Sequence, residues 1–227
     1  MTSAELSPTR RSTIRRGSAR ARTERTELFA VLDAGLHCHL AIQIDGCPRV
    51  VPTGYGRIGD TLYLHGSSGA RTLRAGSEDA AVCVSVTLVD GVVYARSAFH
   101  HSINYRSALV HGRTRHVDDP DEKWRGLRAL TEQLAPGSWE RSRPPTKKEL
   151  AATAVLALDL DEAAVKVRSG GPDDDADDVE AGGRWAGTLP LHHHWGEPVP
   201  SADLAADFPT PAHVTDRRHG SDVRAGR

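Results

Sequence analysis

The sequence predicts a mainly β protein of the α+β class, in which antiparallel strands form a small barrel and helices lie at its periphery. Apolar and polar residues alternate in several short segments, a pattern typical of strands with one buried face. Most of these segments follow one another without a helix between them, as antiparallel sheets allow and parallel sheets do not. Turn residues separate them, and no internal repeat is present.

Length and composition bound the class of protein. The chain has 227 residues, enough for one domain with a full core, and its formal net charge is −1. No run of about 18 apolar residues is present, so no transmembrane helix is expected. Three cysteines without metal-ligand spacing are typical of reduced thiols inside the cell. We therefore expect a cytoplasmic protein without a metal site and without nucleic-acid or membrane partners.

The two ends of the chain differ in composition from the middle. Residues 1–23 are rich in Ser, Thr and Arg without an apolar period, which predicts a disordered basic arm. An arm that becomes ordered across a partner subunit is the alternative. Residues 192–227 begin with three histidines and contain Pro and Asp, which predicts a flexible tail. The folded domain is therefore expected to span residues 24–191.

The first part of this domain is expected to be a helix followed by two strands. Residues 24–34 have apolar side chains at helical spacing, and Gly35 can end the helix. Residues 36–44 alternate between apolar and mostly polar positions, and residues 49–55 are expected to form the second strand. Asp45 and the glycine after it would turn the chain between them.

Residues 54–59 match the glycine pattern of dinucleotide-binding proteins, but we reject that function. The pattern binds a pyrophosphate only where its third glycine begins a helix. Here Gly59 leads into residues 61–65, which alternate as a strand does. The sequence therefore predicts a glycine-rich hairpin, with Arg57 at a solvated tip.

A candidate anion site follows the next strand. After His65, the chain passes through small residues into a short helical segment. Backbone amides, the hydroxyls of Ser67 and Ser68, and the guanidinium of Arg71 could together bind a phosphate. An ordinary capped helix after a strand is the alternative interpretation.

The centre of the chain is expected to hold a hairpin. Residues 80–89 and 92–97 are both apolar and strand-like. Asp90 and Gly91 lie between them, and this pair is a strong signal for a two-residue turn with positive φ angles.

A cluster of polar residues begins the long strand expected at residues 104–117. Asn104, Tyr105, Arg106 and Ser107 are adjacent there, at the start of an otherwise apolar segment. Polar and charged groups beside a β core are costly unless they are paired. We therefore expect this end of the strand to face a polar ligand.

The last third of the domain should contain two helices and further strands. Asp119 and the proline after it predict a helix start, with Leu127 and Leu134 on one face and a stop at Pro136. Thr146 and Glu149 have capping-box spacing. The remaining expected elements are strands at 155–160, 165–168 and 185–191, and an acidic loop at 170–183.

Five segments together resemble the pyridoxamine 5′-phosphate oxidase-like family, in the branch that includes the nitroimidazole-resistance flavoproteins. The resemblance extends from about Glu24 to Leu191. The chain has Gly69, Ala70 and Arg71 where the true oxidases have a Ser-Arg-Lys triplet, and their C-terminal substrate signature is not recognisable. The segments that carry the resemblance are residues 51–53, 62–67, 101–107, 166–168 and 185–190.

The resemblance implies a six-stranded FMN-binding split barrel that forms a homodimer, with the flavin in a cleft between subunits. Thr53 would line the edge of the isoalloxazine ring, Arg71 would hold the phosphate, and Arg106 would add phosphate or ribose contacts. The residues expected to bind the cofactor are Thr53, His65, Gly66, Ser67, Ser68, Arg71, Asn104, Tyr105, Arg106, Ser107 and Trp185.

The expected function is that of an FMN-dependent oxidoreductase acting on an unidentified small molecule, with a nicotinamide nucleotide as the candidate electron donor. The redox chemistry would belong to the flavin, which the protein positions and polarises. His65 is the candidate catalytic residue for proton transfer, since neutral imidazole can accept a proton near pH 7. The alternative is a protein without turnover that binds flavin, deazaflavin or haem.

Overall fold

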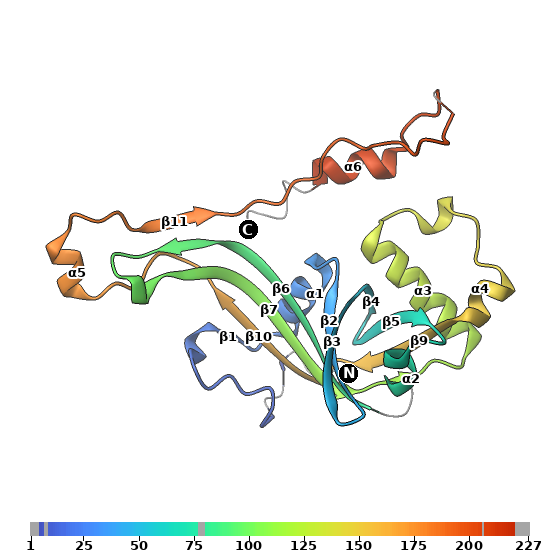
Figure 1. Cartoon of the computed structure of the whole chain (residues 1–227), viewed down its shortest axis with the longest axis horizontal. Coiled ribbons are helices and arrows are strands. Elements are labelled where there is room, and N and C mark those ends of the chain that lie inside the picture. Colours follow the sequence, from blue (N-terminus) through green and yellow to red (C-terminus); the bar gives the residue numbers. More distant parts are fainter. Residues whose placement is uncertain (1–4, 7–8, 77–79, 206, 221–227) are drawn as a thin grey trace.

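The chain folds into two antiparallel sheets with helices at their edges, and the mainly β, α+β class is confirmed (Figure 1). This computed structural model describes residues 5–6, 9–76, 80–205 and 207–220. The first sheet has the order β1-β10-β7-β6-β2-β3, with β11 also paired to β6, and the second has the order β4-β5-β9-β8. The strands are β1 (Ala21–Arg22), β2 (Cys38–Ile44), β3 (Cys47–Thr53), β4 (Tyr55–Ile58), β5 (Thr61–Ser67), β6 (Ala81–Tyr94), β7 (Ser102–Arg113), β8 (Arg115–His116), β9 (Thr153–Asp159), β10 (Glu162–Arg168) and β11 (Gly187–Pro190).

The helices are short and peripheral. None in the described part of the chain is long and apolar enough to cross a membrane. The six α-helices of the described residues are α1 (Arg25–Ala34), α2 (Arg71–Gly76), α3 (Pro120–Leu134), α4 (Lys147–Ala152), α5 (Ala176–Ala181) and α6 (Ala212–Gly220), with 3-10 turns η1 (Ser18–Arg20), η2 (Ala98–His100) and η3 (Trp139–Arg141).

The main core is built from both sheets and α1. The alternation expected for β2 is confirmed, because Cys38, Leu40 and Ile42 are buried while the residues between them are not. Burial raises the pKa of the Cys38 thiol to about 12, so this cysteine stays a protonated core residue. A smaller cluster lies where α3 covers the second sheet.

The glycine-rich segment is a hairpin, as predicted. β4 and β5 pair antiparallel around Gly59, whose φ of 56° is the left-handed turn conformation. Gly56 permits a second close approach, because a Cβ there would lie 2.4 Å from the backbone of Ala129 and Leu130 on α3. Gly59 therefore permits the tight turn, and Gly56 permits α3 to pack closely against β4.

The prediction of a turn at Asp90 and Gly91 is wrong. β6 runs without interruption through both residues, with a bulge between Val89 and Gly91 where the register to β7 shifts. Gly91 is needed for space, since a Cβ would lie 2.7 Å from the carbonyl oxygen of Leu189 on β11. Because β7 and β11 pair with β6 beyond the bulge, the chain reverses later, at residues 95–101.

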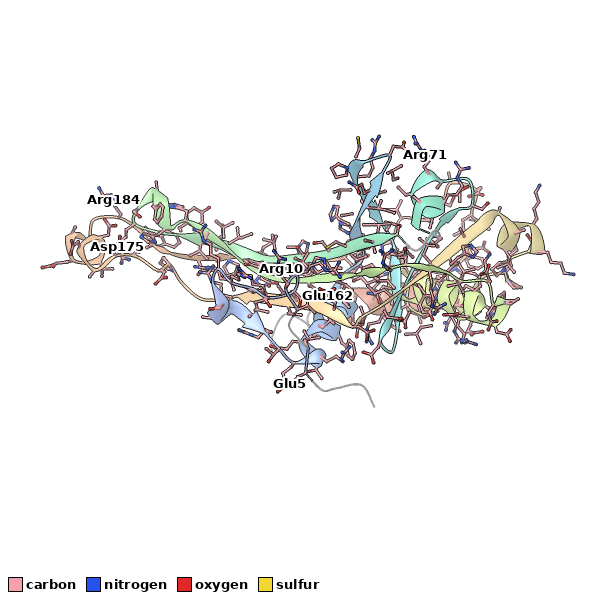
Figure 2. All side chains as sticks on the ribbon, turned by 90° about the horizontal axis from the view of Figure 1, so that it is seen from below. Glu5, Arg10, Arg71, Glu162, Asp175 and Arg184 are labelled. Carbon is pink, nitrogen blue, oxygen red and sulfur yellow. The ribbon has the colours of Figure 1, made fainter. Side chains whose placement is uncertain are left out.

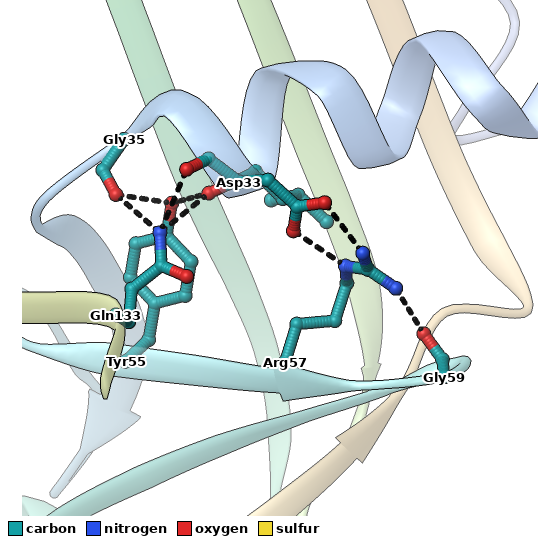
Figure 3. Close-up of polar contacts among 7 residues, drawn as sticks. Asp33, Gly35, Tyr55, Arg57, Gly59 and Gln133 are labelled. Atoms are coloured by element: carbon teal, nitrogen blue, oxygen red, sulfur yellow. Dashed lines mark hydrogen bonds and ion pairs between the residues drawn. The ribbon is translucent and has the colours of Figure 1, made fainter. Parts of the chain in front are cut away.

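Side chains from β4 and α3 bind the carbonyl groups at the end of α1 (Figure 3). The Tyr55 hydroxyl donates to the carbonyls of Leu32 and Gly35. The Gln133 amide donates to the same two carbonyls, at 3.1 and 2.7 Å. The carbonyls at a helix end have no intrahelical hydrogen-bond partners. These contacts therefore provide partners for the last carbonyls of α1 and join the helix to β4 and α3.

Arg57 is not the solvated tip that the sequence predicted. Its side chain is 17% exposed and forms a two-bond ion pair with Asp33, with 2.8 and 2.5 Å contacts (Figure 3). The guanidinium also lies over the Phe29 ring, 4.1 Å from its centroid. The hairpin brings Arg57 beside α1, a proximity that the local sequence does not encode.

The basic arm at the N-terminus lies along β10 instead of standing free, in the residues that the structure describes. β1 pairs with β10, and Leu6 is buried in the main core at 6% exposure. The Glu162 carboxylate on β10 accepts hydrogen bonds from Thr9 and Arg11. The arm uses one apolar anchor, backbone pairing and ion pairs, so it needs no periodic apolar face. Residues 1–4 and 7–8 of the arm lie outside the described ones.

The described part of the C-terminal tail runs over the molecule toward α3 (Figure 1). Its residues are mostly exposed. Arg217 on α6 donates to the carbonyl of Leu134 and lies over the Trp195 ring, 4.1 Å from its centroid. The flexibility of the tail stays a prediction.

Candidate functional site

A cavity of about 470 Å³ lies between α3, α4, η3 and the end of β5. This volume is in the range of small-molecule and cofactor pockets. One imidazole, that of His65, is part of its lining. The walls are mainly apolar, formed by Leu127, Leu130, Leu134, Trp139, Pro145 and Leu150.

Local sequence signals position the two helices that form the cavity. The Asp119 side chain caps α3 by accepting from the amide of Asp121 at 2.8 Å, as predicted. Thr146 and Glu149 form the predicted capping box of α4. The close approach at Gly56 then fixes α3 against β4. The cavity is the space left between two well-terminated helices and the sheet.

His65 lies on β5 opposite Val155. Its ring is exposed to the cavity and has no hydrogen-bond partner within the described residues. Burial by the surrounding protein lowers the pKa of His65, so the neutral imidazole predominates at pH 7. A neutral, unpaired imidazole can accept a proton or bind a metal ion. No three His, Cys, Asp or Glu side chains are grouped for a metal ion in the described chain.

The cavity has one charged pair in its lining. Arg143 and Glu149 form an exposed ion pair with contacts of 2.9 and 2.5 Å. Hydrogen bonds from Arg143 and from Thr146 lower the pKa of Glu149 to about 2. Exposed pairs of this kind contribute little to stability, so Arg143 can exchange its partner for a ligand anion at small cost.

The predicted anion site at the end of β5 is only partly formed. The Ser67 hydroxyl oxygen accepts from the amide of Gly69 at 3.2 Å, while Arg71 forms an ion pair with Asp45 on the β2–β3 turn. Both members of that pair are more than 60% exposed. No hydrogen bond joins Arg71 to Ser67 or Ser68 among the described residues. α2 has only six residues.

Two other predicted residues have packing or local roles. Gly66 gives room to Leu73 of α2, whose side chain would lie 3.0 Å from a Cβ. The Thr53 hydroxyl at the end of β3 donates to the carbonyl of Gly54 at 3.3 Å. Gly54 lines the cavity, so this turn lies close to His65.

The polar cluster at the start of β7 has partners inside the chain, so its pairing does not require the ligand that the sequence led us to expect. That this end of the strand faces a ligand stays a prediction. Arg106 forms a two-bond ion pair with Asp90, at 2.9 and 2.7 Å. The Ser107 hydroxyl donates to the carbonyl of Lys166 at 3.4 Å, and Tyr105 lies opposite Arg168 in the β7–β10 register. The bulge places Asp90 beside β7.

Asn104 leads to a residue that the sequence prediction missed. Its side-chain oxygen accepts from the guanidinium of Arg168 at 2.6 Å, and its amide donates to the carbonyl of Gly170 at 3.1 Å. Arg168 is 6% exposed. The sequence signal that could have identified Arg168 is its position as a charged residue at the end of an apolar strand.

Trp185 lies just before β11 and is 69% exposed. Its ring is 5.6 Å from that of Tyr94 on β6. It therefore belongs to the surface near the β6–β7 reversal and not to the cavity.

The predicted site residues form two separate groups within one chain. The β5 and α2 group lies at one end of the molecule, while the reversal of β6 and β7, α5 and β11 lie at the other (Figure 1). Figure 2 shows Arg71 far from Asp175 and Arg184, which lie beside the second group.

The family of the chain follows from comparison with known proteins. The family model described as pyridoxamine 5′-phosphate oxidase matches residues 24–167. The chain belongs to this family. The predicted resemblance is confirmed, and so is the split-barrel fold. No match was found among curated proteins.

Two solved structures are similar over nearly the whole chain. The flavocytochrome Anf3 from Azotobacter vinelandii is 37% identical, with a TM-score of 0.87 over 93% of this chain and 98% of that one. The FAD and haem binding protein from Mycobacterium smegmatis is 42% identical, with a TM-score of 0.83 over 87% and 96%. A protein described as a 5-nitroimidazole antibiotic resistance protein from Bacteroides thetaiotaomicron, 20% identical, shares the fold over 65% of this chain and 86% of its own, with a TM-score of 0.55.

Proposed function

We propose that this family member is an oxidoreductase that binds two redox cofactors, a flavin and a haem. The observation that carries the proposal is the cavity beside His65, which combines apolar walls with an unpaired neutral imidazole. Two relatives above 35% identity are named for these cofactors, one as a flavocytochrome and one as an FAD and haem binding protein.

The side chains around the cavity fit a haem. His65 would hold the haem iron through a ring nitrogen, which requires the neutral imidazole. The leucines and Trp139 would pack against an apolar macrocycle and exclude water, and Arg143 would pair with a propionate. When bound, a haem supplies one-electron and oxygen chemistry. This role of His65 replaces the proton transfer expected from the sequence, because a nitrogen bound to iron has no free lone pair.

For the flavin we propose FAD, where the sequence favoured FMN, because the M. smegmatis relative is named for FAD. Ser67, Ser68 and Arg71 offer donors for a phosphate, since Arg71 gives up only an exposed ion pair. A flavin can take electrons in pairs and pass them on singly. A nicotinamide nucleotide is the proposed donor, and a small molecule the acceptor.

The cofactors can be tested directly on the purified protein. We expect its absorbance spectrum to show flavin and a haem Soret band, and the released flavin to have the mass of FAD. His65→Ala should lose at least about tenfold in haem affinity, because a metal–ligand bond is removed, while flavin content stays unchanged. Added imidazole should restore the haem spectrum by entering the space of the lost ring.

His39→Ala is the matched control, since His39 is an exposed strand histidine outside the cavity lining. It should leave both spectra unchanged. A wild-type protein that binds flavin but no added haem would refute the haem assignment. Full haem binding by His65→Ala would place the haem elsewhere.

We also propose a homodimer whose interface includes a row of exposed apolar side chains on the first sheet, near the β6–β7 reversal. Val92 pairs in register with Ile103 on one side and with Leu189 on the other, so the three side chains lie on one face. They are 37%, 42% and 57% exposed. Tyr94 and Trp185 extend the row. A second copy would cover this face and bring its β6–β7 end to the His65 end of its partner, so that the two groups of predicted residues meet.

Ile103→Glu is expected to convert the dimer to a monomer of 24.5 kDa. A carboxylate in the middle of an apolar interface must be desolvated, which opposes association. Light scattering after size exclusion measures the mass. Val50→Glu, at an exposed position on β3, is the control and should stay dimeric. A wild-type protein that is monomeric while holding flavin would contradict the proposal.

A further inference from the structure

Arg168 is a buried cation without a carboxylate partner among the residues that the structure describes. Its side chain donates to the side-chain oxygen of Asn104 at 2.6 Å and to the carbonyl of Gly171 at 3.1 Å, with a longer 3.5 Å contact to Gly170. All three acceptors are neutral. Nε of the guanidinium is buried and has no hydrogen-bond partner in the described part of the chain.

This arrangement is unusual for a folded protein. A buried guanidinium cannot lose its proton, so its charge must be balanced by an anion or remain a large desolvation cost. Two arginines near the same end of the molecule do pair with carboxylates: Arg106 on β7 with Asp90, and Arg96, just after β6, with Asp174. Arg168 has no carboxylate partner among the described residues, which indicates that its anion is not one of them.

A polar pocket of about 280 Å³ adjoins Arg168 and is open to the surface. It is lined by Arg20 and Arg22 of the N-terminal arm and by Ser169. Arg22 is paired with Glu27 at 3.3 Å, whereas Arg20 has no partner among the described residues. The pocket contains one exposed carboxylate, Asp173, so three cationic side chains face one anionic side chain.

We infer that this pocket binds a phosphate or diphosphate group, held by Arg168 from the sheet and by Arg20 and Arg22 from the arm. Guanidinium groups match the oxygens of phosphate in geometry and charge. A pocket this small and polar fits the anionic group and not an aromatic ring system. The group can come from the flavin itself or from a separate nucleotide, and the inference holds for either source.

The placement of the arm supports this inference. β1 pairs with β10 so that Ala21 lies opposite Lys166, which brings Arg20 beside the end of β10 where Arg168 lies. Lys166 in turn donates to the carbonyl of Arg16 at 3.0 Å. Figure 2 shows this segment near Glu5, Arg10 and Glu162, lying along the sheet. The arm is therefore positioned as one wall of an anion site, to which it contributes Arg20 and Arg22.

The test uses the full-length protein with inorganic pyrophosphate as the probe. Calorimetry measures its affinity in wild type, in Arg20→Gln and in the control Arg15→Gln. Arg15 is an exposed arginine of the same arm that does not line the pocket. We expect Arg20→Gln to weaken binding about tenfold, because a charge-assisted contact is lost, and Arg15→Gln to change it less than about twofold. Arg168→Lys, which keeps the charge but not the fork, should weaken binding as well.

Added pyrophosphate also identifies the source of the group. Release of bound flavin by pyrophosphate in wild type but not in Arg20→Gln would assign the pocket to the flavin's own phosphates. Binding without flavin release would assign it to a separate nucleotide. Absence of pyrophosphate binding together with absence of flavin release, or equal losses in Arg15→Gln and Arg20→Gln, would overturn the inference. Haem content is unaffected by any of these variants, so the cavity proposal is judged separately.

Discussion

Gly56→Ala is expected to destabilise the protein by about 3 kcal/mol or more and to abolish the cavity beside His65. The new methyl group would lie 2.4 Å from backbone atoms of Ala129 and Leu130, far inside van der Waals contact. Overpacking costs about 1–3 kcal/mol where side chains can yield, and more where the obstacle is a helix backbone. α3 must therefore move away from β4, and Leu127 and Leu130 move with it.

Gly54→Ala is the matched control, two residues earlier in the same segment. A Cβ at Gly54 meets nothing within 4 Å, so its unfolding free energy should stay within about 0.5 kcal/mol of wild type. Urea unfolding gives the stabilities, and haem titration reports the state of the cavity. Similar stabilities for both variants would show that α3 is not seated on β4 through Gly56.

Leu6→Ala is expected to lower the free energy of unfolding by about 2–3 kcal/mol. Leu6 is 6% exposed within the main core, and truncating a buried leucine loses its transfer free energy and leaves a cavity. The sequence predicted a disordered arm, so this substitution tests the observed packing.

Val199→Ala, in the C-terminal tail, is the control because Val199 is 90% exposed. Its effect should stay below about 0.5 kcal/mol. Differential scanning calorimetry of the full-length variants measures both. If Leu6→Ala were as stable as wild type, the arm would contribute nothing to the core, and its role as a wall of the Arg168 pocket would be weakened too.

The sequence by itself determined the elements whose signals are local. Asp119 caps α3, Thr146 and Glu149 form the capping box of α4, and the alternation of β2 gives its buried face. The glycine-rich hairpin was distinguished from a nucleotide-binding turn because the residues after Gly59 alternate. Each of these features depends on side chains and backbone within a few residues of one another, so the local amino-acid sequence is sufficient to predict it.

The tertiary structure alone decided which residues lie together. Asp90 and Gly91 form a bulge because β7 and β11 pair with β6 on both sides, and β11 is distant in sequence. The ion pair of Arg57 with Asp33 and the burial of Leu6 in the main core also join residues that are far apart in the sequence. His65 was recognised from the sequence, but the apolar cavity around it depends on how α3 and α4 pack. The missing anion partner of Arg168 matters only because its guanidinium is buried away from water. Burial is a property of the whole fold and cannot be read from neighbouring residues.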